Sequence, residues 1–504
     1  MLAILYLILP AWWQWSSNVK PAVREVQTLI SPPPEKAALV RELRTIHSSA
    51  QGAPVILTYH DVVDHPELYS VTPKAFASQM QLLHDANYKT LTAAQLVAWL
   101  HGTPVPPHSL AITFDDGATG VWKYADPILA RYGFHAIAFV ITGFVGTHQP
   151  YYMTWPQIEY LESTHRWDIE SHTNRGHVYV VTNALGGRGP FLTSLRYLAA
   201  QHRSETINEY ASRIKTDLAE SKEILISHGI PSPQLFAYPF SSYEGIPQIS
   251  HILHRVIGAD FRAAMLDESG GSAVTSVVDV AAHDLHRVDV TRGNDLTTWT
   301  ANIRAASPLS PAKVLPLSLH DSWTAANDQP VRMKVHGGWA TLRPGPGKWL
   351  GRLFSRSRTS LWRQYTVRGE LGGLGRRGDG TTAGLRVLSD DPQQVQVTVS
   401  AGYYEIRQGL DNSEHLLARG DLPQESRYSV AIDVMPKTVR VLVAGHPVKV
   451  IELYKTDGEM PAGGIELTGQ RRSRTSPLPR FGHLKISEGS GDSLRLPAAV
   501  WLGF

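Results

Sequence analysis

Two hydrophobic patterns follow one another along the chain, and they divide it near residue 307. Before that point, short apolar runs alternate with segments whose apolar residues recur at helical spacing. Strands that alternate with helices in this way indicate a parallel sheet. Seven runs have the length and character of buried strands: Val55–Tyr59, Leu110–Phe114, Ala136–Ile141, Trp167–Ser171, Leu235–Tyr238, Ala263–Leu266 and His286–Val290. We therefore predict an α/β fold, a distorted (β/α)7-type barrel.

The clearest helix is predicted over Glu205–His228, before the stop signal Gly229. Its apolar residues recur every three or four positions: Ile207, Tyr210, Ile214, Leu218 and Leu225. Phe76, Met80 and Leu83 have the same spacing and predict a second buried helix face.

After Ser307-Pro308 the helical period disappears, and short alternating strands separated by glycine-rich turns dominate. The candidates are Tyr365–Glu370, Ala383–Leu388, Val395–Ser400, Tyr403–Arg407, Tyr428–Val434, Thr438–Ala444, Val448–Leu453, Gly464–Leu467 and Leu484–Ile486. This pattern predicts an all-β antiparallel sandwich over 312–504, after an α/β domain over 51–306.

Residues 1–50 are predicted to be an export or anchoring segment followed by a tether. Leu2–Trp15 is apolar except for Pro10 and Gln14, and it ends in tryptophans that suit a membrane interface. It is shorter than the usual spanning length of about 20 residues. We predict a signal anchor or a trimmed signal peptide, and hence an extracytoplasmic protein that is secreted or membrane-anchored. The alternative is an apolar strap packed on the domain. Residues 16–50 are interpreted as a tether with one short helix.

The amino-acid composition excludes several kinds of functional site. A chain of 504 residues with 42% hydrophobic residues is long enough for two or three domains. With no cysteine, disulfides, zinc fingers and thiol catalysis are excluded, and any metal must use histidine and carboxylate ligands. The net charge of +3 is too small to argue for a nucleic-acid partner.

Polar residues gather where four of the predicted strands end: Tyr59–Asp61, Thr113–Gly117, Ser171–His177 and Tyr238–Phe240. The carboxyl ends of barrel strands share one rim, so these segments are expected to meet. Of two adjacent aspartates, one can bind a metal while its neighbour stays free as a base. Two histidines supply the commonest biological ligands for zinc-like ions. An ion held this way lowers the pKa of coordinated water to about 7 and polarises a carbonyl, which favours hydrolysis of an acyl group.

On these motifs, residues 51–306 resemble the polysaccharide deacetylases of carbohydrate esterase family 4, the NodB-homology family. The resemblance implies that Asp115 is the general base. It implies that Pro239 and Phe240 form the third motif, with the backbone N–H of Phe240 binding the oxyanion. It also implies one divalent ion, Zn²⁺ with Co²⁺ or Ni²⁺ as alternatives, held by three residues: Asp116, His172 and His177.

Two details are similar to the subgroup that deacetylates poly-β-1,6-N-acetylglucosamine in biofilm systems. The first detail is the spacing of five between His172 and His177. The second is His60, which precedes the aspartate motif, as the general acid of that subgroup does. An alternative acid is His320, whose surroundings resemble the family's usual C-terminal motif. We favour His60 because His320 follows all seven predicted barrel strands.

One departure concerns the arginine that supports the base in many family members. It is absent before Tyr238, where Phe236-Ala237 stand instead. Arg287 and Arg262 are the candidate substitutes. Aromatic residues near the motifs predict a groove for a polysaccharide substrate: Tyr151, Tyr152, Trp155 and Tyr243.

The predicted sandwich resembles concanavalin-like jelly rolls, so a carbohydrate-binding-like domain is expected, although no catalytic carboxylate pair is evident. Residues 343–377 carry nine Arg or Lys against the single acid Glu370. This run is either a solvated face or a contact with an anionic envelope polymer or membrane surface.

Together these features predict a metal-dependent hydrolase that removes N-acetyl groups from an extracellular poly-N-acetylglucosamine type of glycan. One alternative keeps the fold and changes the substrate to peptidoglycan, chitin or another acetylated glycan. The other is a non-catalytic glycan-binding protein.

Overall fold

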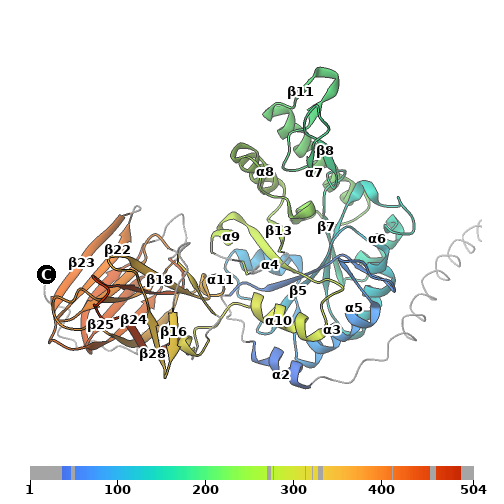
Figure 1. Cartoon of the computed structure of the whole chain (residues 1–504). Helices are drawn as coiled ribbons and strands as arrows, with labels where there is room; N and C mark the ends of the chain where they lie inside the picture. The colour runs from blue at the N-terminus through green and yellow to red at the C-terminus, as the bar shows by residue number, and fades with distance from the viewer. Residues whose placement is uncertain are drawn as a thin grey trace, which may run out of the picture. The chain divides into compact units, whose positions relative to one another are not determined.

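The computed structural model describes most of two compact units, Met1–Ser307 and Pro308–Phe504 (Figure 1). The described residues are 37–46, 52–268, 274–275, 277–312, 314–319, 322–326, 333–389, 391–410, 413–454 and 461–489. The predicted export segment Leu2–Trp15 and the alternative acid His320 lie outside them. Within these ranges, no helix has both the length and the apolar character that a membrane crossing requires.

The first unit is a closed barrel of seven parallel strands. Its members, in their order around the barrel, are β1 (Val55–Tyr59), β14 (Asp284–Asp289), β13 (Ala263–Glu268), β12 (Leu235–Ala237), β7 (Trp167–Ser171), β6 (Ala136–Val140) and β5 (Ser109–Phe114). The barrel closes because β1 pairs with β14 on one side and with β5 on the other. A short eighth strand, β4 (Lys89–Thr90), pairs with the start of β5. The barrel and its seven strands are as predicted from the sequence.

Helices cover the outside of the barrel. They are α2 (Ala37–Thr45), α3 (Pro73–Asp85), α4 (Ala93–Leu100), α5 (Asp126–Tyr132), α6 (Trp155–Ser163), α7 (Ile207–Ser227), α8 (Pro247–Asp260), α9 (Val277–Ala282) and α10 (Leu296–Ala306). Every residue of β1 and of β5 is buried, which is why these strands are continuous apolar runs rather than alternating ones.

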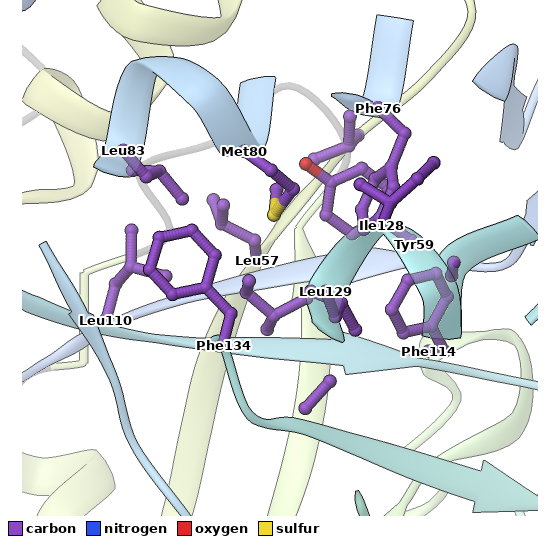
Figure 2. Close-up of a cluster of buried hydrophobic side chains, with 14 of the residues drawn as sticks. Leu57, Tyr59, Phe76, Met80, Leu83, Leu110, Phe114, Ile128, Leu129 and Phe134 are labelled. Atoms are coloured by element: carbon purple, nitrogen blue, oxygen red, sulfur yellow. The ribbon is translucent and has the colours of Figure 1, made fainter. Parts of the chain in front are cut away.

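Figure 2 shows one part of the core between strands and helices. Met80 and Leu83 of α3 lie against Leu57 and Leu110 of the barrel, and Phe76 lies beside Tyr59; all are buried in one cluster. The helix face predicted from their spacing is confirmed.

The longest helix, α7, also confirms its prediction. Thr206 and Glu209 form a capping box at its start, and Gly229 follows its end with φ 78°. The predicted apolar positions Tyr210, Ile214 and Leu218 are fully buried.

The predicted tether needs a correction at α2. Leu39, Val40 and Leu43 of this helix are buried in the same core cluster as the barrel strands. The described part of the segment therefore packs with the first unit, because its apolar stripe is covered by α3 and α10. The packed region begins before residue 51, the boundary expected from the sequence.

The second unit is an antiparallel sandwich of two seven-stranded sheets, and the predicted all-β class is confirmed. One sheet has the order β15 (Trp323–Ala325), β18 (Trp349–Phe354), β27 (Ile465–Gln470), β20 (Thr382–Val387), β21 (Val395–Ser400), β22 (Tyr403–Leu410) and β23 (Ser413–Asp421). The other has the order β16 (Met333–His336), β17 (Trp339–Leu342), β28 (Arg480–Glu488), β19 (Tyr365–Gly372), β24 (Arg427–Met435), β25 (Thr438–Val443) and β26 (His446–Glu452).

The sequence missed five of these strands: β15, β16, β17, β18 and β23. β23 is an edge strand whose residues are mostly exposed, so it has no apolar alternation to recognise. β15 and β16 are only three and four residues long. Short or exposed strands depend on pairing with a neighbour, which a hydrophobic pattern does not record.

Candidate active site

Four polar segments meet at the carboxyl-terminal rim of the barrel, as the parallel order of β1, β5, β7 and β12 requires. Three of these strands are followed by non-glycine residues in the left-handed region: Asp116 at φ 69°, Thr173 at φ 75° and Phe240 at φ 59°. This conformation is costly, above all for a β-branched threonine, and such strain is characteristic of functional sites. Gly117, at φ 79°, continues the sharp turn after β5 without a side-chain penalty.

The predicted metal ligands lie together. The Oδ1 atom of Asp116 is 3.5 Å from Nε2 of His172 and 3.3 Å from Nε2 of His177. One ligand atom from each residue lies within 4.8 Å of the other two. The Asp116 Oδ1 atom is buried and accepts no hydrogen bond from the described residues.

The surroundings of these three side chains fit a divalent metal ion. Nδ1 of His172 lies 2.8 Å from the carbonyl oxygen of Ala237, and a carbonyl only accepts, so Nδ1 carries a hydrogen and Nε2 is the ring nitrogen that faces Asp116. Burial and the adjacent His172 lower the pKa of His177 to about 4, which keeps this imidazole neutral. A carboxylate and two imidazoles, which a divalent ion binds in their neutral form, fit an ion of the zinc type.

Asp115 is held by Arg287 of β14. Two parallel bonds of 2.7 Å run from the guanidinium NH1 and NH2 groups to the two carboxylate oxygens, and the Arg287 side chain is 0% exposed. Burial alone would raise the pKa of Asp115, but the charges of Arg287 and His172 outweigh it and hold the pKa below its usual range. The carboxylate is thus ionised and fixed in orientation, as a general base must be. Arg262 is exposed at the start of β13, so of the two candidate arginines Arg287 is the partner.

Two further carboxylates at this rim were not found from the sequence. Asp267 of β13 contacts the Arg287 guanidinium at 2.6 Å, and it accepts a hydrogen bond from the Thr58 hydroxyl at 3.2 Å. Burial raises the pKa of Asp267 to about 6, and burial with the neighbouring Asp267 raises that of Asp289 to about 6. Their only sequence signal is their place at the ends of two predicted strands.

His60 lies beside the base. One of its ring nitrogens and carboxylate oxygens of Asp115 and Asp267 lie within 4.8 Å of one another. Its Nδ1 atom is buried and has no hydrogen-bond partner among the described residues. A cleft of about 640 Å³ opens here, with His60, Asp116 and Tyr151 in its lining. The geometry predicted for His60 is present, while its role as the acid stays a prediction.

The third motif contributes a wall to the metal site. The ring of Phe240 is 42% exposed and lies 4.3 Å from the His177 ring and 4.8 Å from the Tyr179 ring, measured between centroids. Pro239 is buried and opens the short turn that carries Phe240. Tyr179 belongs to a hairpin, β8 (Tyr179–Val181) with β9 (Arg188–Pro190), that the strand pattern did not reveal.

The four predicted groove aromatics have different surroundings. Tyr151 is 44% exposed and lines the cleft of His60. Tyr152 packs at 5.2 Å from the ring of Phe144, and Tyr243 packs against a buried cluster under α8. Trp155 stacks on His228 at 3.7 Å between centroids. Of these four, Tyr151 alone lines the described cleft.

A buried, arginine-held carboxylate lies beside an Asp-His-His group on the barrel rim, an arrangement that suits hydrolysis. Residues 102–248 match the family model described as polysaccharide deacetylase. The chain therefore carries a polysaccharide deacetylase domain, and the resemblance inferred from the motifs is confirmed.

Two curated relatives that share one name are similar to this chain. The chain is 25% identical over 241 residues to the poly-β-1,6-N-acetyl-D-glucosamine N-deacetylase of Escherichia coli K12, an alignment covering 44% of this chain and 35% of that protein. It is 27% identical over 175 residues to the Staphylococcus epidermidis protein of the same name, covering 34% of this chain and 54% of that one. The chain thus spans about a third to a half of these relatives' lengths.

Among solved structures, a de-N-acetylase from Aggregatibacter actinomycetemcomitans aligns with 49% of this chain and 98% of its own, at 19% identity and a TM-score of 0.42.

Proposed function

We propose that the first unit is a metal-dependent N-deacetylase of an extracellular glycan of the poly-N-acetylglucosamine type. The observation that carries this proposal is the buried Asp115–Arg287 pair next to the Asp116, His172 and His177 cluster. The names of the two curated relatives supply the substrate class.

Asp116, His172 and His177 would hold the ion, Zn²⁺ by preference from one carboxylate and two imidazoles, with Co²⁺ or Ni²⁺ as alternatives. A divalent ion held there would polarise the substrate carbonyl and make the attacking water more acidic.

The remaining steps belong to the chain's own groups. Asp115 accepts the proton of the attacking water, because Arg287 keeps its carboxylate ionised and oriented. The backbone N–H of Phe240 stabilises the oxyanion that forms as the carbonyl is attacked. His60, beside Asp115, donates a proton to the leaving amine, and the C–N bond breaks to give acetate and a free amino sugar.

Extracytoplasmic action, by secretion or by anchoring through residues 1–50, is part of the proposal. Contact of the basic run at 343–377 with an anionic polymer or a membrane surface stays a prediction from the sequence.

The test is acetate release from defined β-1,6- and β-1,4-linked N-acetylglucosamine oligomers, with zinc, cobalt or nickel added. Faster release from the β-1,6 oligomers supports the proposal, and faster release from the β-1,4 oligomers favours chitin or peptidoglycan. The matched control is Asp115→Asn, which keeps the shape of the side chain and removes the base. A chain that binds these oligomers and releases no acetate with any metal would be a glycan-binding protein instead.

A further inference from the structure

The outer face of the β18–β27–β20–β21–β22 sheet is polar and at the same time buried. Gln396, Thr398, Glu466 and Thr468 are each less than 9% exposed, although they point away from the sandwich core. Their neighbours along the strands, such as Val397 and Leu467, fill the core between the sheets. Polar residues on the outer face of a sandwich are normally solvated, so this burial requires a concave surface.

The concave surface is a groove of about 720 Å³. Its size falls in the range of about 300–1,000 Å³ that is usual for small-molecule sites. Strand β20 contributes Thr382 and Arg386 to the lining, and a Cβ at Gly384 between them would overlap the Thr468 hydroxyl. Trp349, 49% exposed, and Tyr403 also line the groove.

A fixed hydrogen-bond network lies within the groove. The Arg386 guanidinium donates to the Gln396 side-chain oxygen at 3.0 Å and to Glu466 at 2.8 Å. It also pairs with Glu414 at 3.1 Å, so three acceptors lock its plane. By contrast, the hydroxyl oxygens of Thr382 and Thr468 are buried and have no partner among the described residues. Unmet buried hydroxyls beside a preorganised network point to a ligand that donates and accepts hydrogen bonds.

The charges of the groove disfavour an anionic ligand. Its lining holds three carboxylates, Glu405, Glu414 and Glu466, and two guanidiniums, Arg386 and Arg407. Each guanidinium is already paired with a carboxylate of the same lining, as Arg407 is with Glu405 at 3.2 Å. A carboxylated or phosphorylated polymer would meet a surplus of negative charge here.

We infer that this groove is a binding site for an uncharged glycan chain. Sugar hydroxyls both donate and accept, which matches the hydroxyls of Thr382 and Thr468. The apolar face of a sugar ring packs on an exposed indole such as Trp349. The groove shares no residue with the deacetylation site. Binding of a glycan chain in the groove and hydrolysis at the barrel rim are therefore separate properties of the protein.

The experiment titrates the full chain with an uncharged β-1,6-linked N-acetylglucosamine hexamer, with the same hexamer after complete de-N-acetylation, and with polygalacturonate. Trp349→Ala removes the exposed indole, and Thr468→Val removes one hydroxyl at nearly constant shape. The matched control is Tyr454→Ala, which removes another exposed aromatic of the second unit that does not line the groove. Thermal unfolding checks that each variant is folded.

We expect Trp349→Ala to weaken binding of the uncharged hexamer about tenfold and Thr468→Val about threefold or more, with Tyr454→Ala unchanged. Acetate release from a disaccharide is unchanged in all three. Unaltered hexamer affinity in both groove variants would overturn the inference, as would tighter Trp349-dependent binding of polygalacturonate or of the cationic hexamer. A chain that shows the Trp349-dependent affinity and releases no acetate would refute the deacetylase proposal alone.

Discussion

Replacing Arg287 tests the site most directly, because one buried side chain joins the base to the barrel. Its guanidinium makes contacts of 2.7, 2.7 and 2.6 Å to Asp115 and Asp267, and the Arg287 side chain is 0% exposed. Hydrogen bonds to charged groups contribute about 1.5–3 kcal/mol each, or about 4.5–9 kcal/mol for three. Desolvation of the guanidinium offsets part of this, and removing one partner of a buried pair costs about 3–5 kcal/mol. For Arg287→Met we therefore expect the melting temperature to fall by about 6–20 °C.

The same change should reduce turnover. Without the guanidinium, burial and the adjacent Asp267 raise the pKa of Asp115, so this carboxyl binds its proton at higher pH. The acid limb of kcat/KM then moves to higher pH, and kcat falls about 100-fold because the base also loses its orientation. Arg287→Lys keeps the charge and loses the two-point contact, so its effects should be intermediate.

The assay is thermal unfolding by circular dichroism together with acetate release across pH. Arg262→Met is the matched control, since Arg262 is an exposed arginine of the same barrel, and it should change stability by less than about 0.5 kcal/mol. If Arg287→Met had the melting temperature and the pH profile of the unsubstituted protein, the assignment of Arg287 as the positioning residue would be wrong.

Three further outcomes are expected. His172→Ala or Asp116→Ala should abolish binding of the divalent ion, because two of three ligands do not hold it, and elemental analysis showing full metal content in both would remove the assignment. Asp115→Asn should keep the ion and lose nearly all turnover, and retained acetate release would place the base elsewhere. His60→Ala should lower kcat by about 10²–10⁴-fold with little loss of metal, while His320→Ala leaves kcat unchanged. A loss of kcat in His320→Ala and not in His60→Ala would make His320 the acid.

The barrel was predictable because its strands are buried on both sides. Segments such as Val55–Tyr59 and Ser109–Phe114 must be apolar throughout, and a continuous apolar run bounded by turns is visible in a sequence. β23 was not predictable, because its side chains are mostly exposed and its conformation depends on pairing with β22. The packing of α2 was not predictable either, because its short apolar stripe indicates a helix but does not indicate which elements that helix packs against.

The order of residues along the chain shows which residue types reach the rim: the aspartate pair, His172 and His60 each stand directly after a recognisable strand, and His177 follows His172 by five residues. How these side chains are held depends on contacts between distant parts of the chain. Arg287 is 172 residues from Asp115 in the chain, and its two-point contact exists because barrel closure brings β14 next to β1 and thus near β5. The polar groove of the second unit also depends on strand pairing, since its residues come from strands far apart in the sequence. Local patterns record burial and periodicity, whereas contacts between distant strands depend on register and closure, which no short segment encodes.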